Sequence, residues 1–193
     1  MLRPPHRSGG FSLLELMVTI TIVAVLTAIA VPSLRNTIQR NRVSSASNDL
    51  LASLAYARTA AITRGQIVSM CPSTTGKSCT TSGQAFEPGW IVYTYPAGPA
   101  SANLAYAASS ATMLRATGQR AGVSIHELQT PVISFGLQGQ LSNGAPLVFL
   151  TCSRTADTGF GVSTAEIPGI QLDVNGTGSA MTTGMFPAAA CSG

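Results

Sequence analysis

Residues 9–34 read GGFSLLELMVTITIVAVLTAIAVPSL, and this stretch decides the fold of the first part of the chain. Between residues 13 and 34 the only charged side chain is that of Glu15. The stretch is about as long as the roughly 20 apolar residues that an α-helix needs to cross a bilayer. Its β-branched residues disfavour a helix in water, but lipid forces the backbone to bond within the segment. We therefore predict a single membrane span over about residues 13–34.

The residues before this span are short, polar and basic, with Arg3 and Arg7. Because positive charges stay on the cytoplasmic side, we expect an inner-membrane anchor with the rest of the chain in the periplasm. A competing interpretation is a signal peptide cut after Ala30, at an acceptable A-x-A site. Against it, the apolar run is longer than usual and contains Glu15, whose burial in lipid is costly and indicates a function.

The motif GFSLLE (residues 10–15) resembles the prepilin motif of type IV pilins and type II secretion pseudopilins. The resemblance implies cleavage between Gly10 and Phe11 by the prepilin peptidase, followed by N-methylation of Phe11. It also implies that Glu15 pairs with the N-terminal amine of a neighbouring subunit in a filament. A buried amine and a buried carboxylate are each costly alone, so their pairing can set the register between subunits.

Four cysteines in an exported chain with only 9% charged residues indicate two disulfides in an oxidising compartment. Three pairings are possible. We pair Cys71 with Cys79, because they bracket a short polar loop. By elimination, Cys152 then pairs with Cys191. A metal site is disfavoured, since there is no C-x-x-C motif and both histidines lie far from the cysteines in the sequence. We expect no cofactor.

The sequence divides into a cleaved leader (residues 1–10), a long helix (11–65) and a globular head (66–193). The helix is predicted to end near Arg64, with Gly65 as its C-cap. An apolar stripe at helical spacing predicts that its second half packs on a sheet; the stripe is Leu50, Leu54, Ala57 and Ala61. Strands are predicted over residues 66–71, 90–95, 132–135, 147–152 and 170–174.

Three later stretches resemble minor pilins of the FimT/FimU kind, which share a domain with the H-type minor pseudopilin of type II secretion. They are residues 58–73, 89–93 and 133–140. This resemblance implies an α+β pilin fold, in which a long N-terminal helix packs on a β-sandwich-like antiparallel domain. The cysteines favour the pilus branch of the family.

Some FimT-like proteins bind DNA through a Gly-Arg-x-Arg motif near the C-terminus. The matching residues 176–179 read GTGS, so both arginines are missing and with them the main source of phosphate affinity. Four other cations could form a patch, namely Lys77, Arg115, Arg120 and Arg154. We regard DNA as a possible but disfavoured partner.

We find no catalytic constellation in the sequence. His126 and Glu127 are adjacent, and neighbouring strand residues face opposite ways. The leading hypothesis is therefore structural: a minor pilin that helps to initiate or cap a type IV pilus together with other pilins, first in the inner membrane and then at the cell surface. The alternatives are a DNA-uptake pilin and a minor pseudopilin of type II secretion.

Overall fold

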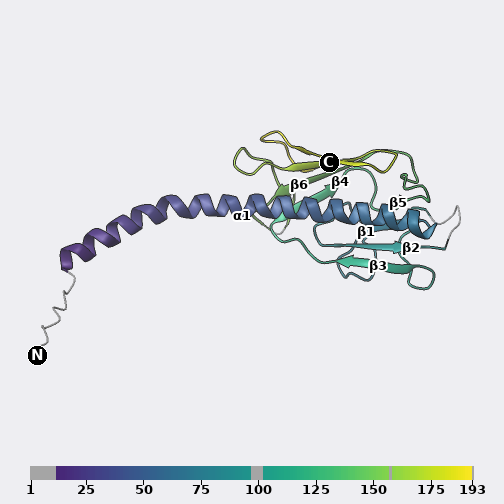
Figure 1. Ribbon diagram of the computed structural model, residues 1–193, viewed down its shortest axis with the longest axis horizontal. Coiled ribbons are helices and arrows are strands. Elements are labelled where there is room, and N and C mark those ends of the chain that lie inside the picture. Colours follow the sequence, from purple (N-terminus) through teal and green to yellow (C-terminus); the bar gives the residue numbers. More distant parts are fainter. Residues whose placement is uncertain (1–11, 97–101, 157, 193) are drawn as a thin grey trace, which may run out of the picture. The chain divides into compact units, whose positions relative to one another are not determined.

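The computed structural model describes residues 12–96, 102–156 and 158–192, and Figure 1 shows it as a ribbon. One α-helix is followed by eight strands. The elements are α1 (Leu13–Arg64), β1 (Val68–Pro72), β2 (Trp90–Thr94), β3 (Thr112–Thr117), β4 (Val123–Glu127), β5 (Ile133–Phe135), β6 (Leu147–Ser153), β7 (Ile170–Val174) and β8 (Ala180–Gly184).

The strands form two antiparallel sheets of four strands each. The first sheet has the order β3-β2-β1-β5 and the second has the order β4-β6-β7-β8. All the pairings are antiparallel, as the predicted β-sandwich-like domain requires. The expected α+β architecture, a long helix packed on antiparallel sheets, is confirmed.

The chain divides into two compact units, Met1–Ile38 and Gln39–Gly193. The second unit, which we call the head, therefore includes the second half of α1 as well as both sheets. The predicted stripe of Leu50, Leu54, Ala57 and Ala61 is buried there, at most 2% exposed. Small alanines let the helix approach the sheets closely, and the main core joins this stripe to side chains of both sheets, among them Trp90 and Phe149.

The end of α1 agrees with the sequence prediction. The helix ends at Arg64, and Gly65 takes a left-handed conformation with φ of 59°. Such a residue after the last turn redirects the chain without a steric penalty. The helix is also continuous through Pro32, although proline removes one backbone hydrogen bond.

The five predicted strands are present, with ends within two residues of the expected ones. β3 and β8 were missed, and β4 was predicted only as a strand or a loop around His126. β3 and β8 are outermost strands, and β8 is fully exposed, with the sequence AMTTG. Such strands lack the alternation of apolar and polar residues that reveals a half-buried strand, so they form only through pairing with a neighbour.

Candidate assembly site

The described part of the first unit, residues 12–38, is an apolar helical segment whose side chains are exposed. Leu13 is 75% exposed and Leu14 is 73% exposed. By length and composition, α1 contains a stretch able to cross a membrane, and none of that stretch is buried in the protein. An exposed apolar helix of this kind needs lipid or other protein helices around it.

Glu15 lies in the first turn of this helix. Ser12 precedes the helix, and its Oγ accepts a hydrogen bond from the backbone N–H of Glu15 at 3.1 Å. The backbone oxygen of Ser12 also accepts the N–H of Leu16 at 3.1 Å. Ser12 is therefore the N-cap, and Ser12 and Glu15 have the spacing of a capping box, which the sequence reasoning did not use.

The Glu15 carboxylate lies in the first turn, at the positive end of the helix dipole. Across residues 12–96, 102–156 and 158–192 it makes no ion pair. The expected cleavage and methylation positions, Gly10 and Phe11, lie outside the described residues.

The four cysteines form the two disulfides expected from the sequence. Cys71 in β1 is bonded to Cys79, with their Cα atoms 5.6 Å apart. Cys152 in β6 is bonded to Cys191, with a Cα–Cα distance of 6.0 Å. The first bond closes the loop that follows β1, and the second ties the C-terminal segment to the second sheet. Both lie in the head, where they make its fold depend on an oxidising compartment.

Two tyrosines next to the first disulfide hold the segment that precedes β3. The hydroxyl of Tyr93 donates to the Leu104 carbonyl oxygen at 2.5 Å, and that of Tyr95 donates to the Ala105 carbonyl oxygen at 2.5 Å. Burial, reinforced by the neighbouring Tyr95, raises the pKa of the Tyr93 phenol. Tyr93 therefore keeps its proton and acts as a hydrogen-bond donor that fixes this segment.

The four cations singled out in the sequence do not form one patch. Arg154 is only 9% exposed, and its guanidinium donates to the Glu87 carboxylate at 3.1 Å and to the Gly159 carbonyl oxygen at 3.2 Å. The second carboxylate oxygen of Glu87 accepts the N–H of Ile125 at 3.1 Å. Arg154 is thus a buried structural residue that joins the segment before β2 to the second sheet.

The other three cations lie around β3. Arg115 and Arg120 line one small polar pocket together with Asp49 of α1. Asp49 forms an ion pair with Arg120 at 2.9 Å, which neutralises that charge. The guanidinium of Arg115 stacks on the Tyr56 ring and that of Arg120 on the Trp90 ring, at 5.6 and 5.7 Å from the centroids.

Lys77 is exposed in the loop closed by the first disulfide. A Cβ on Gly76 beside it would lie 3.8 Å from the Cβ of Ala116 in β3. Ala116 and Arg115 are consecutive in β3 and face opposite ways, so the loop of Lys77 lies against the face of the first sheet opposite to the one that bears Arg115. Arg115 and Arg120 lie on the α1 side, where Asp49 neutralises Arg120.

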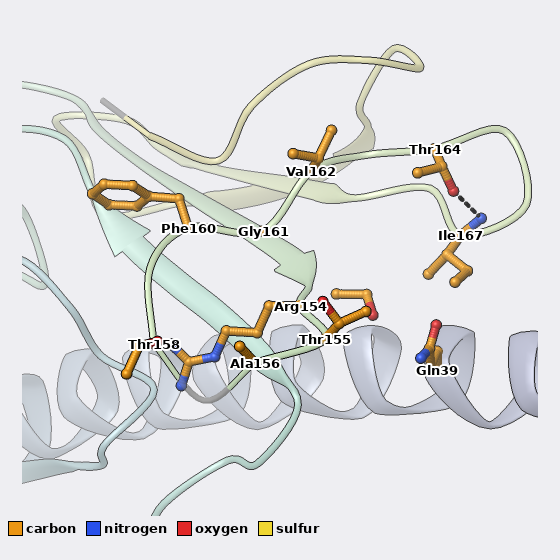
Figure 2. A pocket seen from close by; sticks show the side chains of 11 residues that line it. Gln39, Arg154, Thr155, Ala156, Thr158, Phe160, Gly161, Val162, Thr164 and Ile167 are labelled. Atoms are coloured by element: carbon orange, nitrogen blue, oxygen red, sulfur yellow. Dashed lines mark hydrogen bonds between the residues drawn. The ribbon is translucent and has the colours of Figure 1, made fainter.

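A shallow pocket of about 280 Å³ lies between Gln39 of α1 and the segment that follows β6 (Figure 2). Its wall combines threonine hydroxyls with the apolar side chains of Phe160, Val162 and Ile167. The one guanidinium in the wall is that of Arg154, which Glu87 already engages. The described residues of its wall offer neither a nucleophile paired with a base nor a charge without a partner. Among the described residues, no group of three His, Cys, Asp or Glu side chains could hold a metal ion.

The comparisons with known proteins agree with this geometry. The family model described as "Type II transport protein GspH" matches residues 46–178. The chain belongs to the GspH family. A second model, described as the prokaryotic N-terminal methylation motif, matches residues 5–31. No curated protein matches the chain in sequence.

Two crystal structures of the type IV minor pilin FimU of Pseudomonas aeruginosa have a similar fold. The crystal form in space group P21 has a TM-score of 0.55 and 17% sequence identity, over 78% of this chain and 98% of FimU. The form in space group P65 has a TM-score of 0.51 and 16% identity, over 76% and 99%. At this level of identity the similarity concerns the fold.

Membership of the GspH family makes this chain a minor pilin or pseudopilin, which is a structural subunit and not an enzyme. The methylation motif implies processing by the prepilin peptidase, and the family implies assembly with other pilins. The apolar helix that follows the motif is consistent with anchoring in the inner membrane.

Proposed function

We propose that this chain is a minor pilin of a type IV pilus that helps to initiate the filament or forms part of its tip. In this proposal the peptidase cleaves after Gly10, Phe11 becomes the methylated N-terminus, and the head faces the periplasm before the subunit enters the filament. The observation that carries the proposal is the carboxylate of Glu15, which has no ion-pair partner in the described part of the chain, at the start of an exposed apolar helix.

Glu15 supplies the register of assembly. In the filament its carboxylate pairs with the N-terminal amine of an adjacent subunit, because both groups would otherwise be desolvated without a counter-charge. Leaving one member of such a buried pair unpaired costs about 3–5 kcal/mol. Only the axial positions that bring amine and carboxylate together avoid this cost, so the helices stop sliding at one register.

A pseudopilin of type II secretion is the second candidate, because the matching family model carries that description. The two disulfides and the fold shared with a type IV minor pilin support the pilus. The genes beside this one distinguish the two machines: a secretion operon would contradict the pilus assignment, as would loss of exoprotein secretion on deletion of the gene.

DNA uptake is the weaker alternative. Arg154 is buried against Glu87, and Arg120 is paired with Asp49, so Lys77 and Arg115 are the members of the expected patch without an acidic partner in the described residues. Phosphate binding depends on the number of free cations. We expect no salt-sensitive gel shift of DNA at micromolar head; such a shift, lost in Arg115→Glu, would favour uptake.

The Glu15→Gln variant tests the proposal directly. It keeps the size and helix propensity of the side chain but removes the charge, so we expect normal membrane levels and strong loss from the sheared pilus fraction. Ser12→Ala is the matched control, because it removes the N-cap, worth about 1 kcal/mol, and keeps the carboxylate. If Glu15→Gln enters filaments as the parent does, the proposal fails.

Mass spectrometry of the mature protein provides an independent check on processing. The expected N-terminus is an N-methylated Phe11. A mature chain that begins at Val31 would instead show cleavage as a signal peptide, and it would remove Glu15 and the whole register mechanism with it.

A further inference from the structure

Three of the four outer sheet edges are covered or charged. The segment before β2 covers β4, because Phe86 N–H donates to the Ile125 carbonyl oxygen at 2.8 Å and Glu127 N–H to that of Gln84 at 3.0 Å. The outer edge of β5 is bonded by the segment after it, through Ser142 N–H and the Ser134 carbonyl oxygen at 2.9 Å. β3 carries Arg115 and is paired with β2 through a register shift. Charges and bulges of this kind prevent pairing with other chains.

Within the described residues, β8 has none of these protections. Its sequence, AMTTG, contains no charge and no proline, and its pairing with β7 is regular over all five residues. Every residue of β8 is exposed; Met181 is 65% exposed, and Phe186, two residues past the strand, is 86% exposed. A Cβ on Gly184 would meet no atom within 4 Å. Figure 1 shows the C-terminal part of the chain, in yellow, at the margin of the head.

The ladder fixes which backbone groups face outward. Asn175 N–H donates to the Ser179 carbonyl oxygen, and Met185 N–H donates to that of Gly169, at the two ends of the β7–β8 pairing. In an antiparallel pair, hydrogen-bonded and non-bonded residues alternate. Met181 and Thr183 therefore bond to β7. The N–H and C=O groups of Ala180, Thr182 and Gly184 point to the open side.

We propose that β8 is a docking strand, on which an extended uncharged segment of a neighbouring pilin subunit pairs and adds a fifth strand to the second sheet. The outward groups of Ala180, Thr182 and Gly184 form the new ladder, and Met181 and Phe186 supply apolar contact beside it. An extended backbone matches these groups because it repeats donor and acceptor at the same spacing. The inference rests on the proposed function only in naming a pilin as the partner.

The partner is not a second copy related by a two-fold axis. Such a copy could pair, since the outward residues are symmetric about Thr182. However, the axis would be perpendicular to the sheet and would reverse every direction within it. The head part of α1 runs along the strands (Figure 1), so the N-terminal ends of the two helices would point in opposite directions. Subunits anchored in the same membrane need these ends on the same side.

Thr182→Pro in the full-length protein tests the docking strand. It removes an outward N–H and leaves the bonds to β7 intact, and proline is tolerated at such an edge. We expect about tenfold less of this variant in the sheared pilus fraction. A loss of this size corresponds to roughly one hydrogen bond between the strands together with their close contact at that residue. Thr182→Val, which keeps the N–H, is the matched control and should enter filaments like the parent.

A second variant covers the case in which Thr182→Pro lowers the urea midpoint of the purified protein. Met181→Lys places a charge on the exposed edge without touching the core, and Thr112→Lys does the same on β3, which already carries Arg115. We expect only Met181→Lys to reduce incorporation. Normal incorporation of Met181→Lys, or of a stable Thr182→Pro, overturns the docking strand. If Glu15→Gln also incorporates normally, the proposed function itself fails, so the two failures are distinct.

Discussion

The turn between β7 and β8 lies directly against the backbone of Gly139: a Cβ on Gly178 would be 2.0 Å from the Gly139 carbonyl oxygen. The same oxygen accepts a hydrogen bond from Arg58 Nε of α1 at 3.1 Å. One carbonyl group therefore joins the helix, the segment after β5 and the turn that leads into β8. This contact holds the docking strand in its place on the second sheet.

Gly178→Ala should destabilise the head by about 3 kcal/mol, of which about 1 kcal/mol comes from the left-handed backbone and the rest from displacing Gly139. Gly178 has φ of 79°. Gly144 is the matched control, since its φ is 67° and an added Cβ meets nothing within 4 Å. Urea unfolding of the head measures both variants, and equal losses would show that the contact with Gly139 contributes nothing.

Arg154→Met should cost about 3–5 kcal/mol, because it leaves the carboxylate of Glu87 buried without a counter-charge. Adding Glu87→Gln to this variant should recover much of the loss. The exposed pair is the comparison: Asp49→Ala removes the partner of Arg120, but the Asp49 side chain is 50% exposed, and about 0.2–1 kcal/mol is expected. The prediction is wrong if the two single variants unfold at the same urea concentration.

The two disulfides should differ in their contribution to stability. Cys152 and Cys191 are 39 residues apart and Cys71 and Cys79 are 8 apart, so loop-closure entropy gives about 4 and about 2.5 kcal/mol respectively. Serine pairs at each bridge, compared by chemical denaturation, test this order. A larger loss from the short loop would show that its contacts with the tyrosines, and not chain entropy, set its contribution.

Glu127 should make stability depend on pH. It is fully buried; the Gln129 and Thr130 N–H groups donate to Oε2, while Oε1 has no hydrogen-bond partner among the described residues. Burial raises the pKa of this carboxyl above its ordinary value, although the two backbone donors lower it. The folded state therefore binds the proton more tightly than the unfolded state, so the folded head loses stability as pH rises from the ordinary to the raised pKa.

Glu127→Gln removes this ionisation and keeps an oxygen for the two backbone donors. Its stability relative to the parent should therefore increase as the pH rises above the ordinary carboxyl pKa, because the parent carboxyl then ionises at a cost. Urea unfolding at several pH values measures the difference. A difference that does not change with pH would contradict a buried, ionising Glu127.

Much of the fold could be predicted from local sequence. The stripe of Leu50, Leu54, Ala57 and Ala61 marks the buried face of α1, because helical periodicity is a property of consecutive residues. The β-branched and aromatic residues of β2 and β6 indicate strands in the same way. β3 and β8 give no such signal, since an outermost exposed strand is held by its neighbour and not by its own preference.

The residues of the candidate site also differ in whether the sequence alone could predict their roles. Glu15 stands out in sequence because a lone carboxylate in an apolar run is costly wherever the chain goes. Arg154 gives no such indication, and it was expected at the surface with the other cations. Its partner Glu87 is 67 residues away in the chain, and only the packing of the segment before β2 on the second sheet brings the two together.

The sequence by itself determined the features that depend on neighbouring residues: the apolar helix, its charged first turn, the cap at Gly65 and the family motif. The tertiary structure decided which charges are free and which sheet edge is open. Long-range contacts set both properties, through Asp49, Glu87 and the segments that cover β4 and β5. Burial and pairing of this kind arise only when distant parts of the chain meet, so no local pattern records them.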